Sequence, residues 1–159
     1  MKGKILFAPD DGRGGGKPQG GDMGMLPDLV GYALRCAQVA VFQHFSEAVG
    51  ETAITPPQFG AMVMIEANSG ISQSAIATAL RFDRSTLVQI IDKLEARKLV
   101  IRDISTQDRR SHALKLTPAG ADMIRDLKRK VAEHEAQMTR HLDDTEKAIL
   151  LDLLGKIRA

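Results

Sequence analysis

The chain has 159 residues, of which 43% are hydrophobic, 26% charged and 4% aromatic, with no tryptophan. This composition indicates one globular domain, with or without a tail, around an aliphatic and helix-rich core, and no apolar run reaches the roughly 18 residues of a membrane span. The single cysteine, Cys36, excludes an internal disulfide, and the formal charge of +2 is too small to indicate a partner until it is divided by region.

Residues 1–24 contain eight of the 14 glycines. Such a segment buries too little apolar surface to offset its ordering entropy, so we expect a flexible arm. It also lacks the apolar stretch of a signal peptide, which predicts a cytoplasmic protein. The run ending at Gly16-Lys17 is not a phosphate-binding loop, because Pro18 stands where that loop requires Ser or Thr.

Two helices are predicted next. Apolar residues recur on a helical period over 29–49, with Pro27 in the first turn. Thr55 and Gln58 form a capping box that starts a second helix, which runs to about residue 68.

A helix-turn-helix is predicted between residues 72 and 98. Ser72 caps a short helix over 73–80, and Asp83 caps a second helix from residue 84 to about 98. The second helix has an apolar stripe at i, i+3, i+4 and i+7, formed by Leu87, Ile90, Ile91 and Leu94.

The period changes after this helix. Residues 99–104 and 114–116 alternate as in a hairpin with a polar tip, Thr117-Pro118 begins a long fifth helix, and residues 143–146 cap a sixth. The predicted fold class is therefore mainly α with a small β-hairpin wing: a winged helix-turn-helix with long dimerisation helices.

The second helix of such a motif enters the DNA major groove, and the apolar stripe decides which side chains face outward. Arg84 can reach guanine, Gln89 can pair with adenine, and Thr86 can meet a thymine methyl. Ser85 also points outward, and Lys93 suits a phosphate, as do Arg97 and Lys98. The alternative is a solvated face of a surface helix.

Charge supports the DNA interpretation. Residues 72–115 carry nine bases and five acids, a surplus of four, whereas the whole chain has a surplus of two. The hairpin tip contributes Asp108, Arg109 and Arg110, and an arginine at such a tip fits the electronegative minor groove.

Several motifs in order resemble the multiple-antibiotic-resistance regulator (MarR) family over about residues 25–158. They are Thr55-Pro-Pro-Gln-Phe59, Ile71-Ser-Gln-Ser-Ala75, the run from Asp83 to Val100, Asp108-x-Arg110 and Leu116-Thr-Pro-Ala-Gly120. The resemblance implies a homodimer, double-stranded operator DNA as partner, and a repressor that a small ligand releases. It adds Ser72 and Gln73 to the expected DNA contacts. Lys98 departs from the family, which usually has Gly there.

The resemblance and the apolar stripes of the outer helices together define the expected regions. Residues 25–54 and 117–159 form a helical dimerisation region, and residues 55–116 form the winged DNA-binding region.

Other functions have weaker support in the sequence. Cys36 is interpreted as a small apolar side chain, with a redox-sensing repressor as the alternative. His134 and His141 are seven residues apart on one helix, too far to share a zinc ion. No catalytic motif is present, so we expect neither an enzyme nor a cofactor. A ligand-independent architectural DNA-binding protein is a further alternative.

The remaining interpretation is a small organic effector, with an aromatic acid or its thioester favoured. The family's pocket lies between the dimer helices and the DNA-binding part. There the chain offers an apolar slot and two basic groups for an anion, Arg35 and His44. The slot residues are Tyr32, Phe45, Phe59 and Met62.

Overall fold

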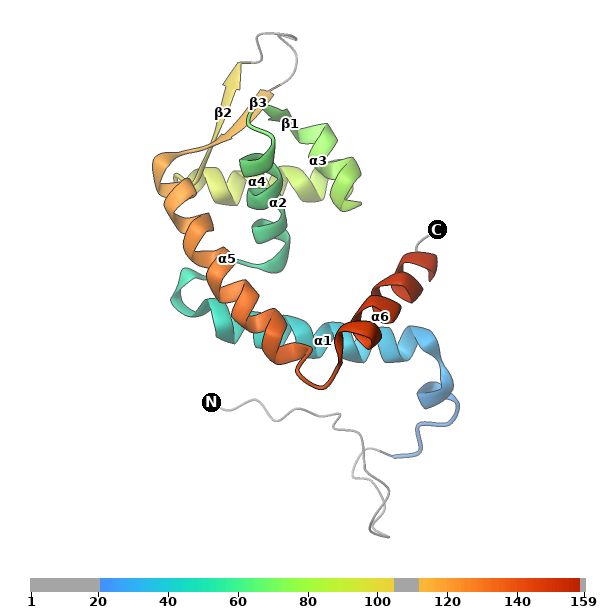
Figure 1. Ribbon diagram of the computed structural model, residues 1–159. Helices are drawn as coiled ribbons and strands as arrows, with labels where there is room; N and C mark the ends of the chain where they lie inside the picture. The colour runs from blue at the N-terminus through green and yellow to red at the C-terminus, as the bar shows by residue number, and fades with distance from the viewer. Residues whose placement is uncertain (1–20, 105–111, 158–159) are drawn as a thin grey trace. The chain divides into compact units, whose positions relative to one another are not determined.

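The computed structural model describes residues 21–104 and 112–157. The described chain divides into two compact units, one ending at Gln43 and one beginning at His44. Helices dominate both units (Figure 1). In chain order the elements are η1 (Leu26–Asp28), α1 (Val30–Val49), η2 (Gly50–Thr52), α2 (Pro56–Ala67), β1 (Ile71–Ser72), α3 (Gln73–Leu80), α4 (Arg84–Ala96), β2 (Val100–Ile104), β3 (His112–Leu116), α5 (Pro118–Met138) and α6 (Asp144–Ile157).

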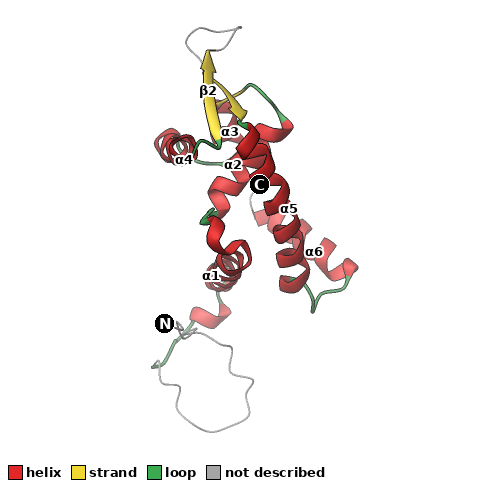
Figure 2. Ribbon diagram, turned by 90° about the vertical axis from the view of Figure 1, so that its left-hand side faces the viewer, coloured by secondary structure: helices red, strands yellow, loops and turns green. Residues whose placement is uncertain are grey.

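The second unit has a core where α2, α3 and α4 meet the sheet and the start of α5. The predicted α4 stripe faces this core, which confirms the helical register derived from the sequence. Figure 2 shows the β2–β3 hairpin projecting beyond α2, α3 and α4. The largest fully buried side chains include Met62, Ile65, Ile76, Leu87, Ile91, Leu94, Leu114, Ile124 and Leu127.

The sheet has three antiparallel strands in the order β1-β3-β2. The predicted hairpin is present, with Val100 opposite Leu116 and Ile104 opposite His112. The strand β1 was not predicted: it has two residues, too few for an alternation pattern. Its pairing of Ile71 with Leu114 joins the start of α3 to the wing.

Local hydrogen bonds explain where the helices begin. The Thr55–Gln58 capping box is present, and the Ser72 hydroxyl accepts a hydrogen bond from the Ala75 amide at 3.2 Å. Thr117 accepts from the Gly120 amide in the same way, at 3.0 Å. These caps confirm the predicted starts of α2, α3 and α5.

Three boundaries differ from the sequence expectation. The helix α5 ends at Met138, so His141 lies beyond it and not on the same helix as His134. Pro27 lies in the separate 3₁₀ turn η1, because Leu29 is extended and interrupts the helix before α1. The helix α4 ends at Ala96 instead of about residue 98, and Lys98 takes a left-handed backbone conformation with φ +58°.

We predict that Lys98→Gly raises the free energy of unfolding by about 0.5–1 kcal/mol, because glycine relieves the left-handed strain of a side-chain-bearing residue. Lys98→Ala is the matched control, since it removes the charge but keeps the Cβ atom. Urea unfolding followed by circular dichroism measures both. Equal stabilisation by Ala and Gly would show that the lysine charge, not the backbone, matters.

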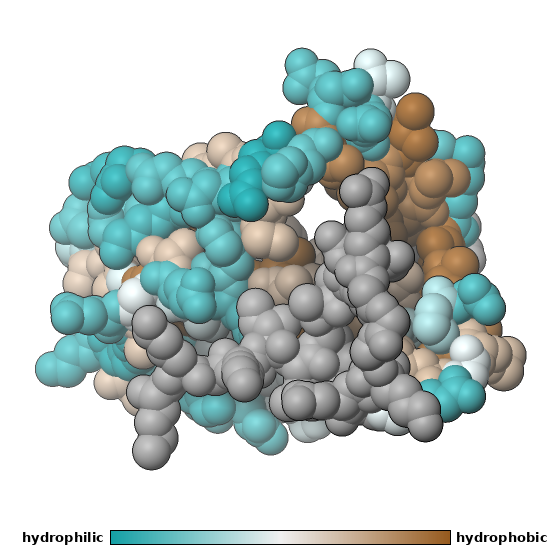
Figure 3. All heavy atoms as spheres, turned by 90° about the horizontal axis from the view of Figure 1, so that it is seen from below, coloured by the Kyte–Doolittle hydropathy of each residue, from teal (hydrophilic) through white to brown (hydrophobic). Residues whose placement is uncertain are grey.

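The helix α6 exposes a set of large hydrophobic side chains: Ile149, Leu150, Leu151, Leu153 and Ile157. Hydrophobic side chains at the molecular surface are visible in brown in Figure 3. An exposed apolar set of this size is typical of a protein–protein interface. No helix within 21–104 or 112–157 is long and apolar enough to cross a membrane.

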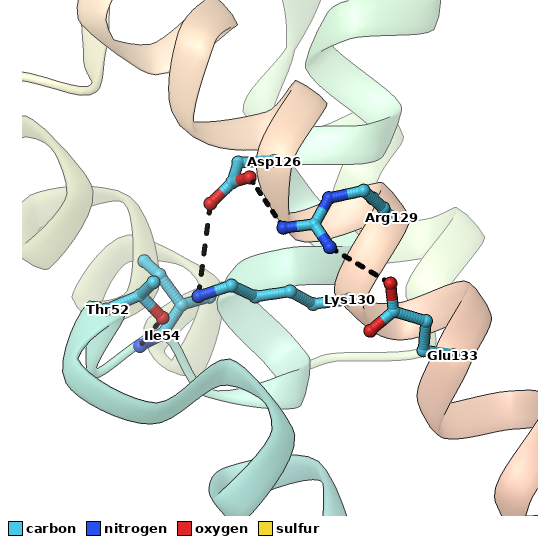
Figure 4. Close-up of polar contacts among 6 residues, drawn as sticks. All are labelled: Thr52, Ile54, Asp126, Arg129, Lys130 and Glu133. Atoms are coloured by element: carbon cyan, nitrogen blue, oxygen red, sulfur yellow. Dashed lines mark hydrogen bonds and ion pairs between the residues drawn. The ribbon is translucent and has the colours of Figure 1, made fainter.

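The solvent face of α5, in contrast, carries ion pairs (Figure 4). The Arg129 guanidinium lies 3.3 Å from Asp126 and 2.9 Å from Glu133, and the Lys130 ammonium lies 3.9 Å from Asp126. Such exposed pairs contribute little to stability.

Candidate nucleic-acid interface

The N-terminus of α4 is fixed by Asp83. Its carboxylate accepts hydrogen bonds from the Ser85 hydroxyl at 2.5 Å, the Thr86 hydroxyl at 2.6 Å and the Thr86 amide at 2.7 Å. These bonds, that from Ser85 first, hold the pKa of Asp83 well below its usual value. The cap therefore stays ionised, and it orients the first turn of α4.

The outer face of α4 carries the side chains predicted to contact DNA. Arg84, Ser85, Gln89 and Lys93 are exposed, and Thr86 is half-buried. Because Asp83 engages the hydroxyls of Ser85 and Thr86, Arg84 and Gln89 are the stronger candidates for base-edge hydrogen bonds. The helix thus presents a polar face over its first half.

Two further predicted DNA contacts lie at the start of α3. Ser72 is half-buried, and its hydroxyl is 3.0 Å from that of Ser74. The amide nitrogen of Gln73 is buried and has no hydrogen-bond partner within the described residues. In this conformation the nitrogen does not face solvent.

The wing strand is joined to α4 by Arg102. Its guanidinium lies 2.5 Å from Asp92 and also bonds Glu95, both on α4. The sequence interpretation missed this contact, although the helical spacing of the two acids is a signal for it. The predicted tip residues Asp108, Arg109 and Arg110 lie outside the described residues.

The C-terminal end of α4 also differs from the expectation for phosphate contacts. The Arg97 guanidinium donates to the Thr52 carbonyl at 2.7 Å, so this side chain ties α4 to η2. Lys93 and Lys98 are exposed.

The effector residues predicted on the first half of α1 lie in the first unit. Tyr32 is half-buried and Arg35 is exposed. A hydrogen bond with the Cys36 thiol raises the pKa of Tyr32. Cys36 is free and half-buried.

The other apolar effector candidates belong to the core of the second unit. Met62 is 0% exposed and Phe45 is 5% exposed, while the half-buried Phe59 packs against Phe45 with ring centroids 6.0 Å apart. These side chains fill space here and do not line an open slot. A ligand reaches Met62 only if the core opens.

A histidine pair that the sequence did not predict joins α1 to α5. His44 Nδ1 lies 2.6 Å from His134 Nδ1, and His44 Nε2 lies 2.9 Å from the Gln137 side-chain oxygen. The pair borders a cavity of about 260 Å³, lined by His44, Glu47, Ala48, Lys130, Glu133, His134 and Gln137. Among the described residues, no group of three His, Cys, Asp or Glu is arranged to hold a metal ion.

This pair predicts a pH-dependent stability. Burial, and then the neighbouring His44, lower the pKa of His134 from its ordinary 6.5. Above about pH 6.5 both the folded and the unfolded chain hold His134 neutral. As the pH falls below that value, the unfolded chain binds the proton more readily, so the free energy of unfolding decreases.

Urea titrations between pH 7.5 and 5 measure this decrease, and His134→Gln should flatten it. His141→Gln is the control, since His141 is exposed. A slope that His134→Gln leaves unchanged would assign the proton uptake to other groups.

Comparisons with known proteins agree with this geometry. The model of the MarR family matches residues 54–112, which span α2, the helix-turn-helix and the strands β1 and β2. A putative transcriptional regulatory protein for the hcr operon of Thauera aromatica is 33% identical over 148 residues, covering 89% of each chain.

Solved structures match as well. The transcriptional repressor CouR bound to a 23-mer DNA duplex superposes with a TM-score of 0.81 at 40% identity, covering 87% of this chain and 98% of CouR. CouR bound to p-coumaroyl-CoA gives 0.80 at 38% identity, covering 86% and 96%. The fold is that of DNA-binding transcription regulators. The chain therefore belongs to the MarR family of transcriptional regulators.

Proposed function

We propose that this chain is a ligand-responsive repressor that binds a pseudo-palindromic operator as a homodimer in the cytoplasm. The observation that carries the proposal is α4, whose exposed polar first half is fixed by the Asp83 cap and backed by a buried apolar stripe. The similarity to DNA-bound CouR supports it.

In this proposal each α4 enters a major groove. Arg84 and Gln89 contact base edges, Ser85 and Thr86 approach the same bases, and Lys93 contacts a phosphate. The wing residues Asp108, Arg109 and Arg110 contact the adjacent minor groove. Ser72 and Gln73, at the start of α3, also contact DNA, and for this the buried amide nitrogen of Gln73 has to turn outward.

The exposed hydrophobic side chains of α6 supply the dimer interface. MarR-family members are dimers, and a symmetric dimer presents two copies of α4 to two half-sites. The dimerisation region in this proposal comprises residues 25–54 and 117–159.

The effector is an aromatic acid or its thioester. The support is CouR, which is 38% identical and was solved with p-coumaroyl-CoA. Arg35 and His44 are the proposed partners of an anionic group, and Tyr32 is a proposed contact of the aromatic part. Phe45, Phe59 and Met62 would surround that part only after the core opens, because they are packed in it. Because His44 is engaged by His134 and Gln137, ligand binding at His44 would have to displace one of these contacts.

A DNA-release assay tests the proposal. A 23-base-pair duplex, the length bound by CouR, is selected from random sequences and followed by fluorescence anisotropy. We expect p-coumaroyl-CoA or another aromatic thioester to release it, whereas free coenzyme A does not. Arg35→Ala or His44→Ala should raise the required ligand concentration and change ligand-free affinity by less than about threefold. Release by peroxide alone would instead support redox sensing through Cys36.

A further inference from the structure

Arg102 connects the two elements of the proposed DNA interface, the helix α4 and the wing strand β2. It lies in the middle of β2, the strand that follows α4, and its side chain is only 19% exposed. Its two terminal nitrogens bond different carboxylates of α4: Asp92, which is 55% exposed, and Glu95, which is 40% exposed. One guanidinium therefore holds two acidic groups of the same helix and offsets half of their combined charge.

The acidic groups are close to the residues that face DNA in the proposed function. Asp92 lies one residue before Lys93 and three residues after Gln89, so it is near both along the outer part of α4. A phosphate backbone repels an uncompensated carboxylate at this place. A positive group that pairs with these carboxylates reduces that repulsion without itself needing to contact DNA.

We propose that Arg102 is a positioning residue of the DNA interface, which halves the net negative charge of the Asp92–Glu95 pair and fixes α4 against β2. The inference rests on the proposed operator binding. In this proposal Arg102 acts on DNA binding through the two carboxylates. It neither contacts a phosphate directly nor serves only to stabilise the sheet.

The test measures binding of the selected 23-base-pair duplex by Arg102→Met. We expect the Kd to rise at least about fivefold at low salt, since two carboxylates on each α4 are then uncompensated near phosphates. The difference from the wild type should narrow between about 0.05 M and about 0.3 M salt, because screening weakens repulsion between exposed charges.

The decisive experiment asks whether neutral replacements of the two acids restore the DNA affinity of Arg102→Met. Adding Asp92→Asn and Glu95→Gln to Arg102→Met removes the repulsion, so we expect the Kd to return to within about twofold of the wild type. If Arg102→Met fails to fold, as judged by circular dichroism, Arg102→Lys replaces it. Lysine reaches one carboxylate at a time, so its smaller loss of affinity should be restored by Glu95→Gln.

Arg129→Met is the matched control. Arg129 also bonds two acids, Asp126 and Glu133, but all three lie on α5 (Figure 4). The Arg129→Met substitution removes the same charge from the whole protein as Arg102→Met does. We expect it to leave the Kd for DNA within about twofold of the wild type.

Three results would overturn the inference. Arg102→Met with wild-type affinity would show that the carboxylates need no compensation. A loss that the neutral analogues do not restore, and that salt does not narrow, would assign Arg102 a structural role or a direct DNA contact. A wild-type protein that binds no DNA would overturn the proposed function, and the role of Arg102 with it.

Discussion

Gly120→Ala is expected to lower the free energy of unfolding by about 2–4 kcal/mol, because a Cβ atom has no room at this position. That atom would lie 2.0 Å from the Leu99 carbonyl oxygen and 2.9 Å from its carbon. Both are backbone atoms, and the same oxygen accepts a hydrogen bond from the Thr117 amide at 3.0 Å. Relief of the clash therefore requires α5 to move away from the start of β2.

Gly60→Ala is the matched control in the same unit. Its Cβ atom would meet only the Leu80 side chain, at an ordinary contact distance of 3.6 Å. Within α2 this change should be neutral or stabilising, since alanine favours a helix. Urea unfolding by circular dichroism compares the two variants. Equal midpoints for Gly120→Ala and the wild type would contradict the close packing of α5 on Leu99.

The largest effects on DNA binding are expected from Arg84→Ala and Gln89→Ala. Each removes a base-edge hydrogen bond worth about 1–3 kcal/mol, and each counts twice in a symmetric dimer. The affinity should fall most for the selected operator and less for unrelated duplexes. Both side chains are exposed, so the melting temperature should stay close to that of the wild type.

Arg125→Ala provides the control, because this exposed arginine pairs with Asp122 on α5, away from α4 in sequence. Binding is measured against duplexes that differ at single operator positions. Relaxed preference at defined positions would support direct base contacts. A uniform loss over all sequences would instead assign Arg84 and Gln89 to the phosphate backbone.

The sequence was sufficient to predict the helices that begin at a capping residue, because a cap depends only on residues close by in the chain. The Thr55, Ser72, Asp83 and Thr117 caps act within three residues, and the apolar stripe of α4 follows helical geometry. For this reason the helix-turn-helix and its wing were predicted, together with the exposed position of Arg84, Gln89 and Lys93.

Contacts between distant residues were the part that the sequence could not supply. The His44–His134 pair joins residues 90 positions apart, and β1 is recognisable only by its pairing with β3. The burial of Phe45 and Met62 likewise depends on how α1, α2 and α5 pack. Periodicity indicates which side of a helix is apolar, but it does not distinguish a filled core from a ligand slot.

A dimer of this chain is expected to bind DNA in a sequence-specific way. The most direct measurement of this binding is selection from random duplexes, followed by sedimentation of the complex with the best sequence. We predict a pseudo-palindrome whose half-sites are about 10 base pairs apart, bound by two chains. Recovery of no preferred sequence, or a single chain bound to an asymmetric site, would contradict sequence-specific binding by a dimer.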